Sequence, residues 1–510
     1  MSRTKFFINN SMTMILQQAV NVAVAFIIPR FLITAYGSEI NGLIVSITQF
    51  ISYFILVEAG ISGASIYSLY KPLAEKNITA INGILSASRK FYLKSGYIFI
   101  IFVTLLALFY PLLINSLSLS NFQIVIIVFC IGAGGTMDFF TLSKYRVLLT
   151  ADQKSYVIST ATIISSIIKI ILVIIFALYK LDIVWLQIFL ILSIFSRSII
   201  LWFYTKKHYT YLDFTVKPNN EAIKDRWNVL YLQLLGSAQI SAPIIIATIF
   251  TSLYQVSVYS IYNMIIGGIS GILGIFISGL AASFGDVIAK NEQKTLQKSH
   301  QEFELFYYMI ITVVYSVSLL LIIPFIQLYT KGVSDVNYIL PLLSYLFVFN
   351  GLLFNLKTPQ GMLVISAGMY KQTKWQSTIQ AALILIIALP LTHFIGLYGI
   401  LIGLICSNIY RDVDLLFFIP KYITKLNYKH TLKRMLLVLF NFMLISLFMI
   451  LIKIKCDNFL DWILYAFIIT IIVSIWVFIT NFILDKNNII NIYIRFKNLT
   501  LGIINDKFKR

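Results

Sequence analysis

Charged residues are scarce in this sequence. Asp, Glu, Lys and Arg together make up 12% of its 510 residues, whereas soluble globular proteins carry about 25%. Hydrophobic residues make up 59%, and the mean hydropathy is +0.87. So few charges cannot cover a surface that faces water, and we therefore expect most of the surface to face lipid.

The side chains that most often carry enzyme chemistry are also rare. The sequence has four histidines and three widely separated cysteines, Cys130, Cys406 and Cys456. It contains neither the H-E-x-x-H zinc motif nor the G-x-x-x-x-G-K-[ST] phosphate loop. We therefore predict no metal centre, no cofactor and no nucleotide hydrolysis, and we expect that the protein is not an enzyme.

Acidic residues are half as frequent as basic ones. There are 20 Asp and Glu against 40 Lys and Arg, for a net charge of +20. Such an excess can indicate a nucleic-acid partner, but here the basic residues are spread over short gaps between apolar runs. That distribution is typical of membrane topology signals and of affinity for anionic headgroups. We expect the lipid bilayer, and no nucleic acid, as a partner.

Long apolar runs are the feature that the sequence has in abundance. A helix needs about 20 apolar residues to cross a bilayer, and lipid admits only helices or closed barrels. These runs are too long for barrel strands, so we predict an all-α integral membrane protein with 14 transmembrane helices. The predicted spans are 11–33, 41–67, 95–115, 122–144, 155–179, 184–204, 227–250, 256–284, 305–328, 337–358, 375–395, 397–419, 435–454 and 459–484.

The gaps between these spans alternate in charge. Of the 40 Lys and Arg, 33 lie at the two ends, in the gaps after even-numbered spans or at the inner ends of even-numbered spans, as Arg411 does in span 12. The gaps after odd-numbered spans hold four, and three lie within spans. Basic loops stay in the cytoplasm, so both termini are predicted to be cytoplasmic. The alternation persists to the last hairpin, which supports the count of fourteen.

A weak internal repeat suggests how the spans are grouped. Ile-Ser-Gly ends span 2 at residues 61–63 and span 8 at residues 277–279, and similar polar stretches follow both copies. Six spans separate the copies, which predicts two six-helix bundles related by a parallel pseudo-repeat, plus a C-terminal helical hairpin. The predicted parts are an N-lobe (1–204), a cytoplasmic connecting loop (205–226), a C-lobe (227–434), the hairpin (435–484) and a basic cytoplasmic tail (485–510).

Six charged residues within the predicted spans or at their edges are candidates to carry the protein's chemistry. A charge at the bilayer centre costs about 2.5–3.5 kcal/mol on insertion scales, so such residues usually face a cavity or a partner. We predict that cations in a water-filled cavity bind an anionic headgroup, and that nearby acids support them or bind a coupling ion. The predicted substrate-binding cations are Arg30, Lys169 and Arg197, the supporting acids are Glu58 and Asp138, and Arg411 is a candidate contact from the second lobe.

Each of these residues also has a structural interpretation. Arg30 could extend to the outer headgroups, because long basic side chains reach water from within a membrane. Glu58 and Asp138 could pair with the cations of the first bundle and lock its helices together. Arg411 could pair with an acidic neighbour close to the inner surface. The sequence leaves both interpretations open for every one of these residues.

Three segments near the N-terminus resemble a known family. Residues 29–32 (P-R-F-L), 36–43 (Y-G-S-E-I-N-G-L) and 68–76 (S-L-Y-K-P-L-A-E-K) are similar to the first hairpin and the following loop of polysaccharide flippases. These are Wzx-type proteins of the MATE-like flippase (MOP) superfamily. The motifs cover about the first 95 residues, and the span count extends the resemblance to the whole chain.

The resemblance implies a flippase that moves undecaprenyl-diphosphate-linked oligosaccharide across a bacterial cell membrane for O-antigen, capsule or exopolysaccharide assembly. It also implies alternating access around a cationic cavity, and a polysaccharide polymerase among the partners. Arg30 matches the family's hairpin motif by position, whereas Lys169 and Arg197 match only in kind. A MATE-type ion-coupled drug or metabolite antiporter is an alternative that predicts an acidic cavity. A membrane enzyme of glycan assembly is another, and it predicts a larger outer loop.

Overall fold

The structure is a computed structural model that describes residues 3–58, 61–114, 116, 118–219, 226–451 and 454–508. Within these residues the chain forms helices and no strands, which confirms the predicted all-α class. Residues 220–225 of the predicted connecting loop and Lys453 of a predicted outer gap lie outside the described residues. By packing, the chain divides into unit 1, residues 1–261 with 332–336, and unit 2, residues 262–331 with 337–510.

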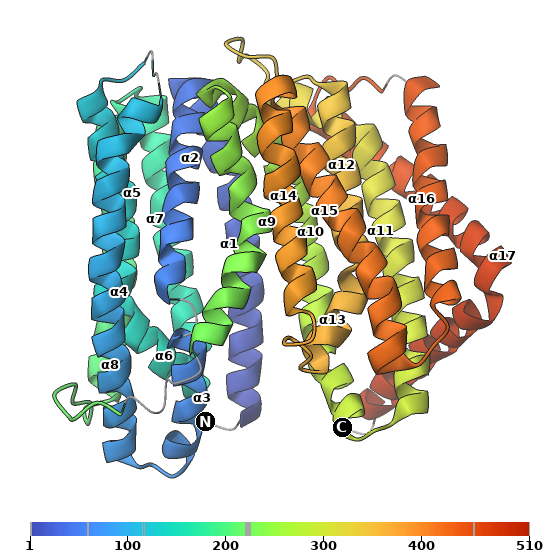
Figure 1. Cartoon of the computed structure of the whole chain (residues 1–510), viewed down its shortest axis with the longest axis horizontal. Coiled ribbons are helices and arrows are strands. Elements are labelled where there is room, and N and C mark those ends of the chain that lie inside the picture. Colours follow the sequence, from blue (N-terminus) through green and yellow to red (C-terminus); the bar gives the residue numbers. More distant parts are fainter. Residues whose placement is uncertain are drawn as a thin grey trace. The chain divides into compact units, whose positions relative to one another are not determined.

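The helices follow the chain in the order that Figure 1 labels. Those up to the unit boundary are α1 (Arg3–Tyr36), α2 (Ser38–Ile55), the 3-10 turn η1 (Leu56–Glu58), α3 (Ile61–Ala74), α4 (Ile78–Leu113), α5 (Asn121–Met137), the π-helical turn η2 (Asp138–Leu142), α6 (Ser143–Ala151), α7 (Ser155–Leu178), α8 (Ile183–His208), α9 (Arg226–Phe250) and α10 (Leu253–Ala289), which crosses it. The others are α11 (Gln293–Tyr329), α12 (Pro341–Leu356), α13 (Thr358–Ser366), α14 (Lys374–Ile395), α15 (Leu397–Ile419), the π-helical turn η4 (Pro420–Thr424), α16 (Tyr428–Leu451) and α17 (Phe459–Phe508).

Every predicted span coincides with one helix or with consecutive helices. Among the described residues, ten helices are long and apolar enough to cross a membrane. The spans outside those ten coincide with α2, α9, α12 and α15. α12 has only 16 residues, and α15 contains three charged residues, Arg411, Asp412 and Asp414. The multi-pass helical membrane fold is therefore confirmed, while the number fourteen stays a prediction.

Two predicted spans are interrupted, and both interruptions lie at an acidic residue. Span 2 was predicted as one helix over 41–67, but α2 ends at Ile55 and the 3-10 turn η1 ends at Glu58. Span 4 was predicted over 122–144, but α5 gives way to a π-helical turn that begins at Asp138. Hydropathy does not reveal such breaks, because the apolar run continues through them. π-Helical turns within helices are frequent at functional sites.

Unit 1 is built around one large apolar core. Figure 1 shows α1, α4, α5, α7 and α8 as its long helices, and α1 packs on α7, α7 on α8, and α4 on α5. α2 joins α9 and α10 through buried polar contacts. Asn41 donates to Ser257 at 2.7 Å, and Thr248 donates to Ser46 at 2.7 Å. A Cβ atom on Gly42 would lie 1.9 Å from the Leu253 carbonyl oxygen, so only glycine permits this close approach.

By packing, α9 and the first turns of α10 therefore belong to unit 1, where α9 contacts α2. The loop between α11 and α12 also contributes to unit 1, because the backbone N–H and hydroxyl of Ser38 donate to Asp335 at 2.6 and 2.7 Å. The predicted lobes, 1–204 and 227–434, were drawn from the sequence repeat and stay a prediction.

In unit 2 the last two helices pack on α11. Ile445 of α16 and Val473 of α17 form a small apolar cluster against Val313 of α11. α17 is longer than the predicted span 459–484, because it continues to Phe508 after a kink at Asp485, where φ is −144° and ψ is 45°. The first part of the segment predicted as a tail is therefore helical.

Candidate functional site

Asp138 and Arg197 form an ion pair in unit 1. Asp138 begins the π-helical turn η2, and Arg197 lies in α8, which packs on α5. An Arg197 Nη2 atom donates to Asp138 Oδ1. The two side chains keep 26% and 22% of their surface exposed. The expected pairing of Asp138 with a cation of the first bundle is thus present in the structure, and the pair is not sealed within the core.

Glu58 forms a second ion pair beside the first. Arg146 of α6 donates to Glu58 Oε1 at 2.6 Å, and the Ser143 hydroxyl lies 3.2 Å from the other carboxylate oxygen. The same hydroxyl donates to the backbone carbonyl of Asp138 at 2.8 Å. Asp138 also interacts electrostatically with both Glu58 and Arg146. Ser143 therefore joins the pairs into one group, which we call the unit 1 charge cluster: Glu58, Asp138, Arg146 and Arg197.

The local backbone explains how these residues meet. In η2 the N–H of Ser143 bonds to the carbonyl of Asp138, five residues earlier, which rotates α6 relative to α5. The following ring, Phe139, is buried against Phe99 of α4 with ring centroids 5.2 Å apart. The turn therefore sends the ring into the core while Asp138 is directed to Arg197.

Lys169 and Arg30 lie outside this cluster. Lys169 of α7 is half-buried, and within the described part of the chain its ammonium group has no ion-pair or hydrogen-bond partner. Arg30 of α1 is also half-buried. Because α1 packs along α7, the two residues occupy neighbouring helices. Lys169 is therefore a half-buried cation with no carboxylate bound to it.

Arg411, the candidate from the second lobe, lies in unit 2 and pairs within its own helix. Its guanidinium donates to Asp414 at 2.6 Å, and both side chains are mostly buried. The adjacent Asp412 is buried, and neither of its carboxylate oxygens has a hydrogen-bond partner among the described residues. Lys357 interacts with Asp412 electrostatically but donates its hydrogen bond to Asn408, at 2.5 Å. This group is separate from the unit 1 charge cluster.

Two functional candidates were missed by sequence reasoning. Arg146 lies two residues beyond the predicted end of span 4, so it was counted as a loop residue. In unit 2, Arg434 donates to Glu304 at 2.8 Å and also pairs with Asp485 at 2.5 Å. Glu304 and Arg434 each lie one residue outside a predicted span. The signal for Arg146 was the intramembrane charge of Glu58, which predicts a cation beside it, but the sequence offered other cations of the first bundle for that role.

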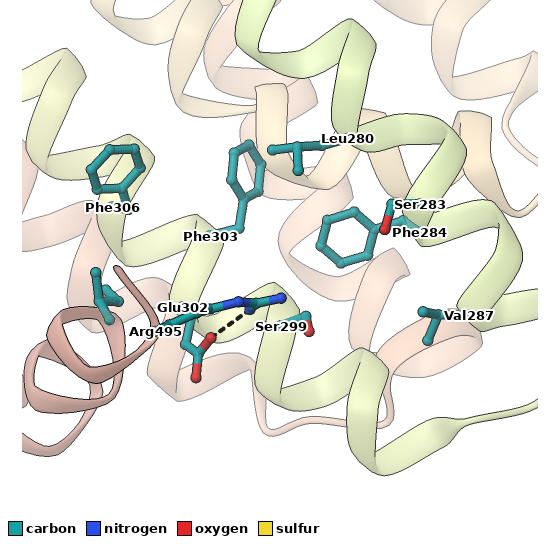
Figure 2. A pocket seen from close by; sticks show the side chains of 10 residues that line it. Leu280, Ser283, Phe284, Val287, Ser299, Glu302, Phe303, Phe306 and Arg495 are labelled. Atoms are coloured by element: carbon teal, nitrogen blue, oxygen red, sulfur yellow. Dashed lines mark hydrogen bonds and ion pairs between the residues drawn. The ribbon is translucent and has the colours of Figure 1, made fainter. Parts of the chain in front are cut away.

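A groove in unit 2 contains none of the predicted site residues. It has a volume of about 310 Å³ and lies among α10, α11 and α17, with Phe284 and Phe303 in its largely apolar wall. Figure 2 shows Arg495 of α17 reaching Glu302 of α11, an ion pair of 2.7 Å. In the part of the chain that the structure describes, no group of three or more His, Cys, Asp or Glu side chains is placed to hold a metal ion.

Comparisons with known proteins identify the fold. No protein-family model and no curated protein matches the sequence. An inward-facing multidrug resistance MATE family transporter of the MOP superfamily matches with a TM-score of 0.65 and 16% identity, over 82% of this chain and 98% of that chain. The lipid II flippase MurJ, in an inward closed conformation, matches with a TM-score of 0.66 and 14% identity, over 93% and 99%. The MATE multidrug transporter DinF-BH matches with a TM-score of 0.60 and 17% identity, over 84% and 98%.

These likenesses show that the chain has the fold of MATE transporters and MurJ. The expected resemblance to the MATE-like flippase superfamily is confirmed at the level of fold, whereas the Wzx-type assignment stays a prediction.

Proposed function

We propose that this protein is a flippase that moves an undecaprenyl-diphosphate-linked oligosaccharide from the inner to the outer leaflet of a bacterial cell membrane. The cargo would serve the assembly of a cell-surface polysaccharide, with a polysaccharide polymerase among the partners. The proposal includes alternating access around a cationic cavity, and it needs no cofactor.

The observation that carries the proposal is the excess of half-exposed cations in unit 1. Among the described residues, Arg146 and Arg197 each have one carboxylate partner, and Lys169 has none. Arg146 and Arg197 are partly exposed beside their two acids, and Lys169 of α7 is a further cation of unit 1 outside the unit 1 charge cluster. A diphosphate suits such a group, because a guanidinium donates two parallel hydrogen bonds to phosphate oxygens and an ammonium adds a point charge. A cationic drug would be repelled by the same surplus.

Glu58 and Asp138 have a defined role in this mechanism. A carboxylate that pairs with each guanidinium keeps it oriented within the membrane when no cargo is bound. Because the pairs keep part of their surface exposed, a diphosphate can approach the free N–H groups without breaking the pairs first. The acids would then support the cations, and Lys169 would supply the charge that is not yet neutralised.

The proposal is tested by deleting the gene in cells, supplying variants in its place, and measuring the amount of surface polysaccharide. Arg197→Gln and Lys169→Gln should each lower polysaccharide by about tenfold or more, because each removes a charge-assisted contact worth roughly 1.5–3 kcal/mol. Arg197→Lys should keep partial activity, since a point charge replaces the planar fork. Lys180→Gln, an exposed lysine just past α7, is the matched control. Normal polysaccharide in both glutamine variants, at normal protein abundance, would refute the cationic mechanism.

A MATE-type antiporter is the second candidate, because two of the matched structures are multidrug transporters and the cluster contains two acids. It predicts that Glu58→Gln and Asp138→Asn raise drug susceptibility while surface polysaccharide is unchanged. The flippase predicts the reverse: loss of polysaccharide and unchanged susceptibility. Measuring both readouts in the same strains separates the two functions.

We also infer that both termini are cytoplasmic, from the charge alternation of the gaps. Leu181→Cys and Lys331→Cys, in a chain without its three native cysteines, should react with a membrane-impermeant thiol reagent added to intact cells. Labelling only after the cells are opened would reverse the proposed orientation.

A further inference from the structure

The segment after α8 is fixed against the body of unit 1. Tyr209 donates to Asp152 at 2.5 Å, and Asn82 of α4 donates to the Tyr211 carbonyl at 3.0 Å. Further along, the N–H of Asn219 donates to the carbonyl of Gly83 at 3.0 Å. These bonds hold residues 209–219 over α4 and α6, so the one aromatic ring between the anchors, Phe214, has a defined place.

Two cations converge on that ring. The guanidinium carbon of Arg89, from α4, lies 5.7 Å from the centroid of Phe214, and the ammonium nitrogen of Lys144, from α6, lies 5.1 Å from it. Tyr145 meets Phe214 edge to face at 6.4 Å, and its ring centroid lies 5.0 Å from the same ammonium. Aromatic faces attract cations, which explains how these half-buried side chains are oriented.

Neither cation has an anionic partner in the part of the chain that the structure describes. Among the described residues, Arg89 and Lys144 make no ion pair and no hydrogen bond, although each interacts electrostatically with the other and like charges repel. Nearby cations differ, because Arg146 binds Glu58 at 2.6 Å and Lys154 binds Asp152 at 2.8 Å.

The acidic neighbour of Phe214 does not supply the missing charge. The Asp213 carboxylate accepts two bonds from Thr215, at 2.8 Å from the backbone N–H and 2.6 Å from the hydroxyl, and its side chain is exposed. The structure therefore places two like charges beside one ring, and no counter-ion to either lies among the described residues.

We propose that Arg89 and Lys144, positioned by Phe214, bind a phosphate group at the end of unit 1 that is predicted to be cytoplasmic. A phosphate or diphosphate has enough oxygens to accept from a guanidinium and an ammonium together, and its charge removes their mutual repulsion. The site is distinct from the unit 1 charge cluster. It needs only a phosphate-bearing ligand and so does not depend on the proposed cargo.

Three ligands distinguish the source of the phosphate: inorganic diphosphate, phosphatidylglycerol and undecaprenyl diphosphate. Binding of each to the detergent-solubilised full chain is measured by native mass spectrometry for wild type, Arg89→Gln, Lys144→Gln and Lys90→Gln. Lys90 is the matched control, because it is the exposed cation next to Arg89 on α4. Loss of one charge-assisted contact should weaken binding of at least one ligand about tenfold or more in the first two variants and leave it unchanged in Lys90→Gln. The ligand that responds identifies the source.

Thermal unfolding provides an independent readout. Without ligand, Arg89→Gln and Lys144→Gln should have the same Tm as wild type or a higher one, because the repulsion between the two cations is removed. With ligand, only wild type and Lys90→Gln should gain stability. If a glutamine variant does not fold, Arg89→Lys keeps the positive charge and tests whether the planar guanidinium itself is needed for binding.

Unchanged binding of all three ligands in both variants would overturn the site. An equal loss in Lys90→Gln would also overturn it, because the attraction would then be diffuse. Binding in detergent is independent of the polysaccharide assay, so this site and the proposed function can fail separately.

Discussion

One ion pair from each unit joins two helices, and the two pairs differ in how far they are exposed. In unit 1 the side chains of Glu58 and Arg146 are 14% and 33% exposed, whereas in unit 2 those of Glu304 and Arg434 are 1% and 7% exposed. Both pairs lie between helices, but the Glu58 and Arg146 pair is within reach of a ligand whereas the Glu304 and Arg434 pair is almost fully buried. The difference suggests that the pairs of unit 2 hold helices together, and that those of unit 1 are available for binding.

Breaking the buried pair of unit 2 should have the largest effect on stability. Arg434→Met leaves Glu304 and Asp485 without their shared cation, and an uncompensated buried charge costs about 3–5 kcal/mol. The melting temperature of the purified chain in detergent should fall by roughly 10 °C. A melting temperature equal to that of wild type would remove the contrast between the units.

The Asp412 and Lys357 pair of unit 2 should show coupled effects of intermediate size. Asp412→Asn leaves the half-buried Lys357 without the carboxylate with which it interacts, and Lys357→Met leaves a buried carboxylate whose oxygens have no hydrogen-bond partner among the described residues. Each single change should cost about 2–3 kcal/mol, and the double variant should cost less than either one. A double-mutant cycle of unfolding measures this coupling, and strict additivity would show that the two groups do not interact.

Arg197→Gln in unit 1 should cost only about 1 kcal/mol of stability, because its pair with Asp138 is partly solvated. Transport should nevertheless fail in the same variant. Comparing its melting temperature and surface polysaccharide with those of Arg434→Met sharpens the contrast. If Arg197→Gln lost as much stability as Arg434→Met, the unit 1 pair would be a structural lock instead.

The smallest effect is expected for the exposed pair of Lys290 and Asp286. The hydrogen bond and the charge of Asp286 raise the pKa of Lys290 above its ordinary value. A group whose pKa is raised by folding contributes stability that is complete below its unfolded pKa and is lost as the pH rises through the folded pKa. Lys290→Gln should therefore leave the melting temperature at pH 8 almost unchanged. In wild type the melting temperature should fall slightly as the pH rises above the ordinary pKa of lysine, and the variant should not show this fall. A large shift at pH 8 would contradict the solvated character of this pair.

The sequence was sufficient to predict the helices, because an apolar run in lipid must satisfy the hydrogen bonds of its own backbone and a helix does so. The pairing of Asp138 with a cation of the first bundle was one of the two interpretations that the sequence left open, and the structure shows it with Arg197. The partner of Glu58 could not be predicted. Spans drawn from hydropathy end at the first charged residues. The helix α6 nevertheless continues through Arg146, whose charge is neutralised by Glu58.

The same limit explains Glu304 and Arg434, which lie at the edges of predicted spans and become buried by pairing across helices. The side-chain directions of Glu58 and Asp138 depend on irregular turns of the backbone. The 3-10 turn at Glu58 and the π-helical turn at Asp138 change the direction of a side chain without changing the hydropathy of the run. Their effect exists only in the packed unit, and it decides which acid meets which cation.

The kink at Asp485 limits how far α17 extends along one direction. An α-helix rises 1.5 Å per residue, so the 50 residues of α17 would extend about 75 Å if straight, far beyond the roughly 30 Å of a hydrocarbon layer. With the bend, the first part keeps a length suited to crossing, and the remainder returns to α11, where Arg495 bonds to Glu302. Arg434 binds the very residue at which the direction changes. Its loss would therefore free the distal half of α17 to project into water, where protease digestion would detect it first.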